Sequence, residues 1–139
     1  MFTEYMMKNA EKQWTTKAGY EAIVVVQPQG HRCGYVKVPK GHPVDYRQYD
    51  EIDIDVHGGS TYRDYDNDGT IFGFDCAHYG DAPDVSLMDL KYRLVHDQLC
   101  SVENIYVDGV IRSLDYCIEE CENMAKQFKE LETNQHTDI

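Results

Sequence analysis

Long hydrophobic runs are missing from this sequence of 139 residues. The longest uninterrupted run, residues 22–26, has five residues, whereas a membrane-spanning helix needs about 20. The first twelve residues carry four charged side chains and no apolar stretch, so we expect no secretion signal. These absences predict a cytoplasmic protein that has no membrane partner.

Positive charge is also scarce, because 13 Lys and Arg face 25 Asp and Glu for a formal net charge of −12. Such a balance argues against direct nucleic-acid binding, which depends on cations that contact phosphates. Ten of the acids and only one base lie between Glu51 and Asp89. This concentration predicts an acidic face that binds a partner protein with a basic surface. Its predicted members are Asp53, Asp55, Asp64, Asp66 and Asp68.

A disulfide framework is the third absence. The sequence has five cysteines, an odd number, and their spacing matches no pattern typical of disulfide-rich domains. We therefore expect free thiols and a reducing compartment.

The hydrophobic periodicity predicts an α+β fold. Alternating or β-branched segments predict an antiparallel sheet of four or more strands, at about 20–27, 31–39, 51–57 and 70–77. Apolar residues at helical spacing over 113–130, with Ser113 as the N-cap, predict an amphipathic helix packed on one face of the sheet. We expect residues 1–18 to form a helix or a flexible arm, 19–131 a single domain and 132–139 a disordered tail.

A hairpin turn at 66–69 has consequences for potential metal ligands. If the turn closes a regular hairpin, His57, Cys76 and His78 share one face, and this donor set suits Zn²⁺. For the fourth ligand His42 ranks first and Asp81 second, ahead of His31 and Cys33. Asp81 could instead orient an imidazole. The alternatives are a hydrogen-bonded histidine pair beside a buried cysteine, a Cys76 nucleophile with a histidine base, and a calcium loop at 64–69.

Two sequence blocks carry a family resemblance. Residues 57–62 read His-Gly-Gly-Ser-Thr-Tyr, and residues 73–81 read Gly-Phe-Asp-Cys-Ala-His-Tyr-Gly-Asp. They resemble the H-G-G-x-T-[YF] and G-F-D-C-A-H-x-G-D blocks of a family of small phage and prophage proteins of Gram-positive bacteria. The resemblance covers about residues 19–129, and the acidic residues 63–68 depart from it as an insert.

The resemblance implies a phage accessory protein that inhibits a component of host defence, in the manner of an anti-CRISPR protein. It also favours a structural zinc ion held by His42, His57, Cys76 and His78, on which the family blocks centre. We expect a non-enzymatic protein of this kind. One alternative is a sponge for a nucleotide-derived immune signal, and another is a small zinc hydrolase with Asp75 or Asp81 as its base. The sponge requires a pocket of aromatic rings and cations, for which the candidates are Arg32, Tyr35, Tyr62, Arg63 and Phe74.

Overall fold

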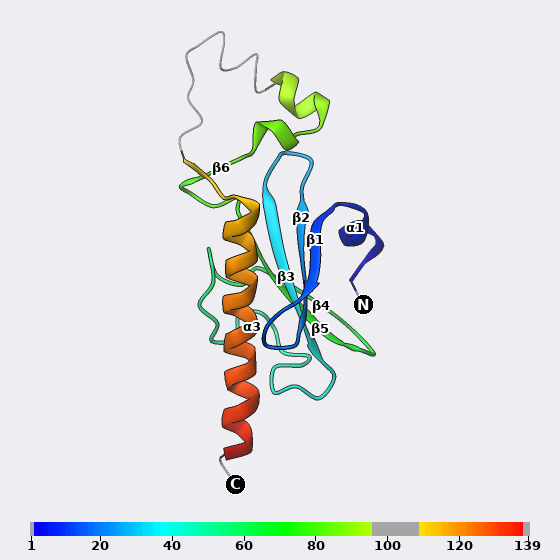
Figure 1. Ribbon diagram of the computed structural model, residues 1–139, viewed down its shortest axis with the longest axis vertical. Helices are drawn as coiled ribbons and strands as arrows, with labels where there is room; N and C mark the ends of the chain where they lie inside the picture. Colours follow the sequence, from blue (N-terminus) through cyan, green and yellow to red (C-terminus); the bar gives the residue numbers. More distant parts are fainter. Residues whose placement is uncertain (1, 96–108, 138–139) are drawn as a thin grey trace.

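A computed structural model describes residues 2–95 and 109–137 of the chain. A five-stranded antiparallel sheet has the order β1-β2-β3-β5-β4, and the C-terminal helix α3 packs on one of its faces (Figure 1). The predicted α+β class is therefore confirmed. The strands of this sheet are β1 Ala10–Thr15, β2 Glu21–Val26, β3 Arg32–Pro39, β4 Tyr62–Asp66 and β5 Gly69–Asp75. The remaining elements are α1 Glu4–Lys8, β6 Asp81–Ala82, η1 Val85–Leu87, β7 Val110–Ile111 and α3 Leu114–Thr137.

None of the helices in the described part of the chain is both long and apolar enough to cross a bilayer.

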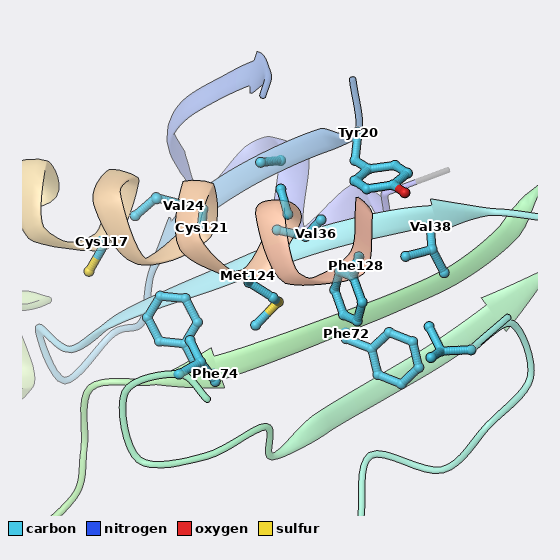
Figure 2. Close-up of a cluster of buried hydrophobic side chains, with 14 of the residues drawn as sticks. Tyr20, Val24, Val36, Val38, Phe72, Phe74, Cys117, Cys121, Met124 and Phe128 are labelled. Atoms are coloured by element: carbon cyan, nitrogen blue, oxygen red, sulfur yellow. The ribbon is translucent and has the colours of Figure 1, made fainter. Parts of the chain in front are cut away.

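The sheet is buried on both faces, which explains the continuous apolar run in β2. Ala22 and Val24 face α3, whereas Ile23 and Val25 face α1. Figure 2 shows the α3-side core, in which the helix contributes five fully buried side chains. They are Cys117, Cys121, Met124, Ala125 and Phe128. Burial of this stripe stabilises the contact between the helix and the sheet.

Helix α3 begins as predicted and ends later than predicted. The Ser113 hydroxyl accepts a hydrogen bond from the Tyr116 amide at 3.1 Å, which is the expected N-cap contact. The helix continues to Thr137 and so includes most of the segment 132–139 that was predicted to be a disordered tail. Its first apolar residues, Leu114 and Ile118, are only partly buried, because they lie at the margin of the core.

The N-terminal segment contains both a helix and a strand. Thr3 caps the short helix α1, and its side chain accepts a hydrogen bond from the Met6 amide. Within the segment 1–18, which was predicted to form a helix or a flexible arm, Trp14 stands at helical spacing from other apolar residues. In the structure it lies in the edge strand β1. Its indole Nε1 donates to Glu122 of α3 at 3.0 Å. Pairing with β2 therefore decides the conformation of residues 10–15 against their local helical pattern.

Residues 51–57 do not form the predicted strand, because 51 and 52 form a bend, 53–56 are irregular and 57 begins a turn. Their alternation is as expected, with Val56 buried and Ile52 and Ile54 partly buried against the core. The backbone, however, bonds to side chains of α3. The Gln127 amide accepts from Asp55 N at 2.8 Å and donates to Asp55 O at 2.7 Å. A segment with alternating apolar residues can therefore bury them without pairing to another strand. Hydrophobic periodicity alone does not distinguish such a segment from a strand in a sheet.

Replacing Gln127 by Ala removes both of these hydrogen bonds. We expect a loss of roughly 1 kcal/mol in the free energy of unfolding and faster hydrogen exchange at the amide of Asp55. The neighbouring exposed residue offers a matched control, because Lys126→Ala should leave exchange in this segment unchanged. Equal exchange rates in wild type and Gln127→Ala would show that these two hydrogen bonds do not hold residues 51–57 against α3.

Candidate functional site

The β4–β5 hairpin has the predicted register. Arg63 lies opposite Phe72 and Tyr65 lies opposite Thr70. The β4–β5 ladder ends at the pair Tyr62–Gly73, where β4 begins, whereas β5 continues to Asp75 in its pairing with β3. His57 and His78 nevertheless lie side by side, with ring centroids 6.2 Å apart. The hairpin therefore brings the two blocks of the sequence pattern to one end of the sheet.

Local contacts explain the residue types in these two blocks. Gly58 has φ +66°, and a Cβ at this position would lie 2.2 Å from the His78 ring. Thr61 donates its hydroxyl proton to Asp75 at 2.9 Å, and the other Asp75 oxygen accepts from the Ala77 amide at 3.1 Å. The segment 57–61 and the loop 75–78 are therefore interlocked through a small glycine and a capping carboxylate.

The Asp81 carboxylate is the centre of the site, and its side chain is only 1% exposed. It accepts hydrogen bonds from His57 Nε2 at 2.8 Å, Arg112 Nε at 2.7 Å and the His78 amide at 3.1 Å. Burial alone would raise the pKa of Asp81, but the bonds from His57 and Arg112 outweigh it and lower this pKa. Asp81 therefore stays ionised and ties together three segments of the chain.

His57 has a partner on each ring nitrogen. Because Nε2 donates to Asp81, Nδ1 accepts from the Tyr116 hydroxyl at 2.7 Å. The Arg112 guanidinium lies 5.1 Å from the centre of the Tyr116 ring, and burial raises the pKa of this phenol. The chain Asp81–His57–Tyr116 fixes the tautomer of the imidazole and could pass a proton along its length. It leaves no lone pair of His57 free for a metal.

Cys76 points into the core and does not complete the histidine pair. It is 2% exposed and lies in the same α3-side cluster as Phe72 and Phe74. Its Sγ is 3.7 Å from the Sγ of Cys117 on α3. As strand alternation predicts, Cys76 lies on the same face of the sheet as Phe72 and Phe74. Helix α3 covers this face, so the side chain of Cys76 lies in the core.

His42 lies near the other half of α3. Its Nε2 donates to the Phe128 carbonyl at 2.9 Å, and its Nδ1 accepts from the Val44 amide at 3.1 Å. Phe128 is twelve residues from Tyr116, which corresponds to about 18 Å along a helix. The structure therefore separates His42 from His57. Within residues 2–95 and 109–137, no three His, Cys, Asp or Glu side chains are grouped to hold a metal, and zinc binding stays a prediction.

The burial of His42 has a consequence for pH dependence. Burial lowers the pKa of His42, although its hydrogen bond to Phe128 opposes this effect in part. The unfolded chain therefore binds a proton near pH 6.5 while the folded protein resists it. We expect the free energy of unfolding to fall as the pH drops below about 6.5. The variant His42→Gln should flatten this dependence in urea titrations.

The residues proposed for a nucleotide pocket do not meet. Tyr35 packs against Tyr62 at a centroid distance of 5.0 Å on the α1 side of the sheet, whereas Phe74 is buried on the α3 side. Arg32 is 7% exposed and is bound by the carboxylates of Glu11 and Asp84. The sheet separates the two sets of rings, so they do not line a common cavity.

The predicted acidic residues all have exposed side chains, and they lie on two segments. Asp53 and Asp55 belong to the irregular segment that Gln127 holds. The other three, Asp64, Asp66 and Asp68, lie on the β4–β5 hairpin. Lys37 is 8% exposed, and its Nζ is 3.9 Å from a carboxylate oxygen of each of the two hairpin-tip residues, Asp66 and Asp68.

An aromatic pair beside this hairpin was not predicted. Tyr46 and Tyr65 are about half exposed, with ring centroids 5.2 Å apart. Tyr46 has φ +65°, an unusual conformation for a tyrosine. The Tyr46 amide donates a hydrogen bond to the Thr70 hydroxyl at 2.9 Å, and Arg63 donates to the Tyr46 carbonyl at 2.8 Å. Periodicity gives no signal for this pair, because residues 44–50 form no regular strand or helix.

Comparisons of the chain with protein-family models, with curated proteins and with solved structures find no match.

Proposed function

We propose that this protein acts without catalysis, by binding the basic surface of a host-defence protein and blocking it. The hairpin acids Asp64, Asp66 and Asp68 form the main group of binding residues, and Asp53 and Asp55, on the segment held by α3, form a second group. The resemblance of the two sequence blocks to small phage proteins supports host defence as the target. The net charge of −12 supports a basic partner.

The observation that carries this proposal is the exposure of all five acids on segments that the fold holds in place. Asp55 is anchored through its backbone, so its carboxylate can point outward while the chain stays fixed. The β4–β5 hairpin is likewise paired over its whole length. Carboxylates held in fixed positions can take the place of nucleic-acid phosphates in a basic groove. They lose little conformational entropy on binding.

The tyrosine pair supplies apolar contact area beside the charges. Tyrosine is enriched in protein interfaces because its ring is large, rigid and amphipathic. Tyr65 stands between Asp64 and Asp66 in the edge strand β4, so its ring points to the opposite face of the strand from these two acids, and the Arg63 guanidinium lies 4.5 Å from the centre of the ring. An interface of this composition would combine electrostatic steering with a compact hydrophobic contact.

The test is a phage-infection assay in a host that carries an active defence system. Expression of the wild-type chain should restore plaque formation. Reversal of Asp64, Asp66 and Asp68 to Lys should abolish this protection. A second triple variant provides the control with the same net charge, because Glu21, Glu119 and Glu130 are also exposed acids. Their reversal to Lys should leave protection intact.

Binding to the defence protein, once it is isolated, should weaken steeply above about 0.15 M salt, where the Debye length is about 8 Å. The hairpin reversal should slow association more than it speeds dissociation. Equal protection by both triple variants, or an affinity that does not depend on salt, would contradict the proposal and leave the acids as determinants of solubility.

A further inference from the structure

Two cysteine thiols meet at the end of the α3-side core. Cys76 follows β5 directly. Cys117, which is labelled in Figure 2, lies in the first turn of α3. Their sulfur atoms are 3.7 Å apart, and the two residues are 2% and 0% exposed. Both cysteines are free thiols. The pair therefore joins the sheet to the helix through two sulfur atoms that the site described above does not use.

This spacing is close to that of two sulfurs on one metal ion. With metal–sulfur bonds of about 2.3 Å, the sulfurs are about 3.8 Å apart at a tetrahedral angle and about 4.6 Å apart in a linear arrangement. Neither geometry requires the pair to separate by more than about 1 Å. A metal ion that binds both sulfurs in a linear arrangement therefore moves them apart by about 1 Å.

Charged groups of both signs act on the two cysteines. The guanidinium of Arg112 interacts electrostatically with Cys76, and that of Arg32 interacts with Cys117. The carboxylates of Asp75 and Asp81 act on Cys76 in the opposite sense. The neighbouring Cys117 and burial raise the pKa of Cys76.

We propose that Cys76 and Cys117 form a two-thiolate site for a soft monovalent metal ion, Cu⁺. Soft thiolate ligands select Cu⁺, which needs only two of them. Zn²⁺ requires four ligands, and the described residues group no third side chain of the required type with this pair. On binding, two S–H bonds release their protons to solvent and two S–Cu bonds form. The oxidation state of copper does not change.

The site can be tested by anaerobic titration of the full chain with Cu⁺ against the coloured chelator bicinchoninate. The wild type should bind one Cu⁺ ion per chain in competition with the chelator. Both Cys76→Ala and Cys117→Ala should lose at least tenfold in affinity. Cys33→Ala is the matched control, because Cys33 is a buried free thiol on the α1 side of the sheet and its removal should not change uptake.

X-ray absorption of the copper-loaded wild type gives a second readout that does not depend on the folding of any variant. Two sulfur neighbours and no nitrogen or oxygen neighbour are expected. A different ligand set, the absence of uptake, or uptake that is equal in wild type and both alanine variants would overturn the proposal. None of these outcomes bears on the acidic surface, so the two proposals stand or fall separately.

Discussion

Replacing Asp81 by Asn should destabilise the protein by roughly 3 kcal/mol, which corresponds to about 10 °C in Tm for a chain of this length. The carboxylate accepts from His57, Arg112 and the His78 amide while its side chain is almost fully buried. An asparagine offers only one acceptor oxygen and places an NH₂ group against one of these donors. The loss should appear in both thermal and urea unfolding.

Asp75→Asn is the matched control for this prediction. Asp75 belongs to the same block and also bonds to a backbone amide, but its side chain is 33% exposed. Water can therefore replace the lost contacts, and we expect a change below about 1 kcal/mol. The wild-type protein should also lose the Asp81 contribution in acid, because the lowered pKa means that folding stability falls as the pH drops through that value. An Asp81→Asn variant as stable as Asp75→Asn would contradict this account.

Adding a single methyl group at Gly34 should cost about 3 kcal/mol. A Cβ at this position would lie 2.4 Å from the Phe74 ring and 2.8 Å from the sulfur of Cys121. Both neighbours belong to the fully packed α3-side core, so neither can move aside without displacing the helix. The Gly34→Ala variant should unfold at a markedly lower urea concentration than the wild type.

A double-mutant cycle tests the cause of this effect. Phe74→Leu shortens the side chain that the new methyl group would strike, so the double variant should be more stable than the sum of the two single losses. If the two effects add, the cost at Gly34 comes from the backbone and not from the contact with Phe74.

The elements that the sequence predicts correctly are those whose apolar face packs against a neighbouring strand or helix with the expected periodicity. Strands β2, β3 and β5 and the start of helix α3 fall within about two residues of their predicted positions, whereas α3 ends seven residues later than predicted. The hairpin register follows from one turn, because a two-residue side-chain period leaves few alternatives once 66–69 closes. The juxtaposition of His57 and His78 agrees with an extension of that register, although both residues lie outside the ladder and are held together by Asp81.

Other features depend on contacts that periodicity does not contain. The backbone of residues 51–57 bonds to α3, more than 60 residues away in sequence. Arg112 and Tyr116 enter the Asp81 network because α3 begins beside it. His42 is held next to Phe128 by a tertiary bond, which places it far from the other predicted ligands. Only the packing of the helix on the sheet determines these placements.

The strand order has a consequence for how the chain folds. Strands β1, β2 and β3 are consecutive, whereas β3 pairs with β5 and leaves β4 outermost. The pairing of Pro39 with Gly69 closes a loop of about 30 residues, and this closure has an entropic cost that local hairpins avoid. We expect the β1–β3 meander to gain protection first during refolding, followed by the β4–β5 hairpin, which docks as a unit. The Asp81 network then assembles late, and variants of it should speed unfolding more than they slow folding.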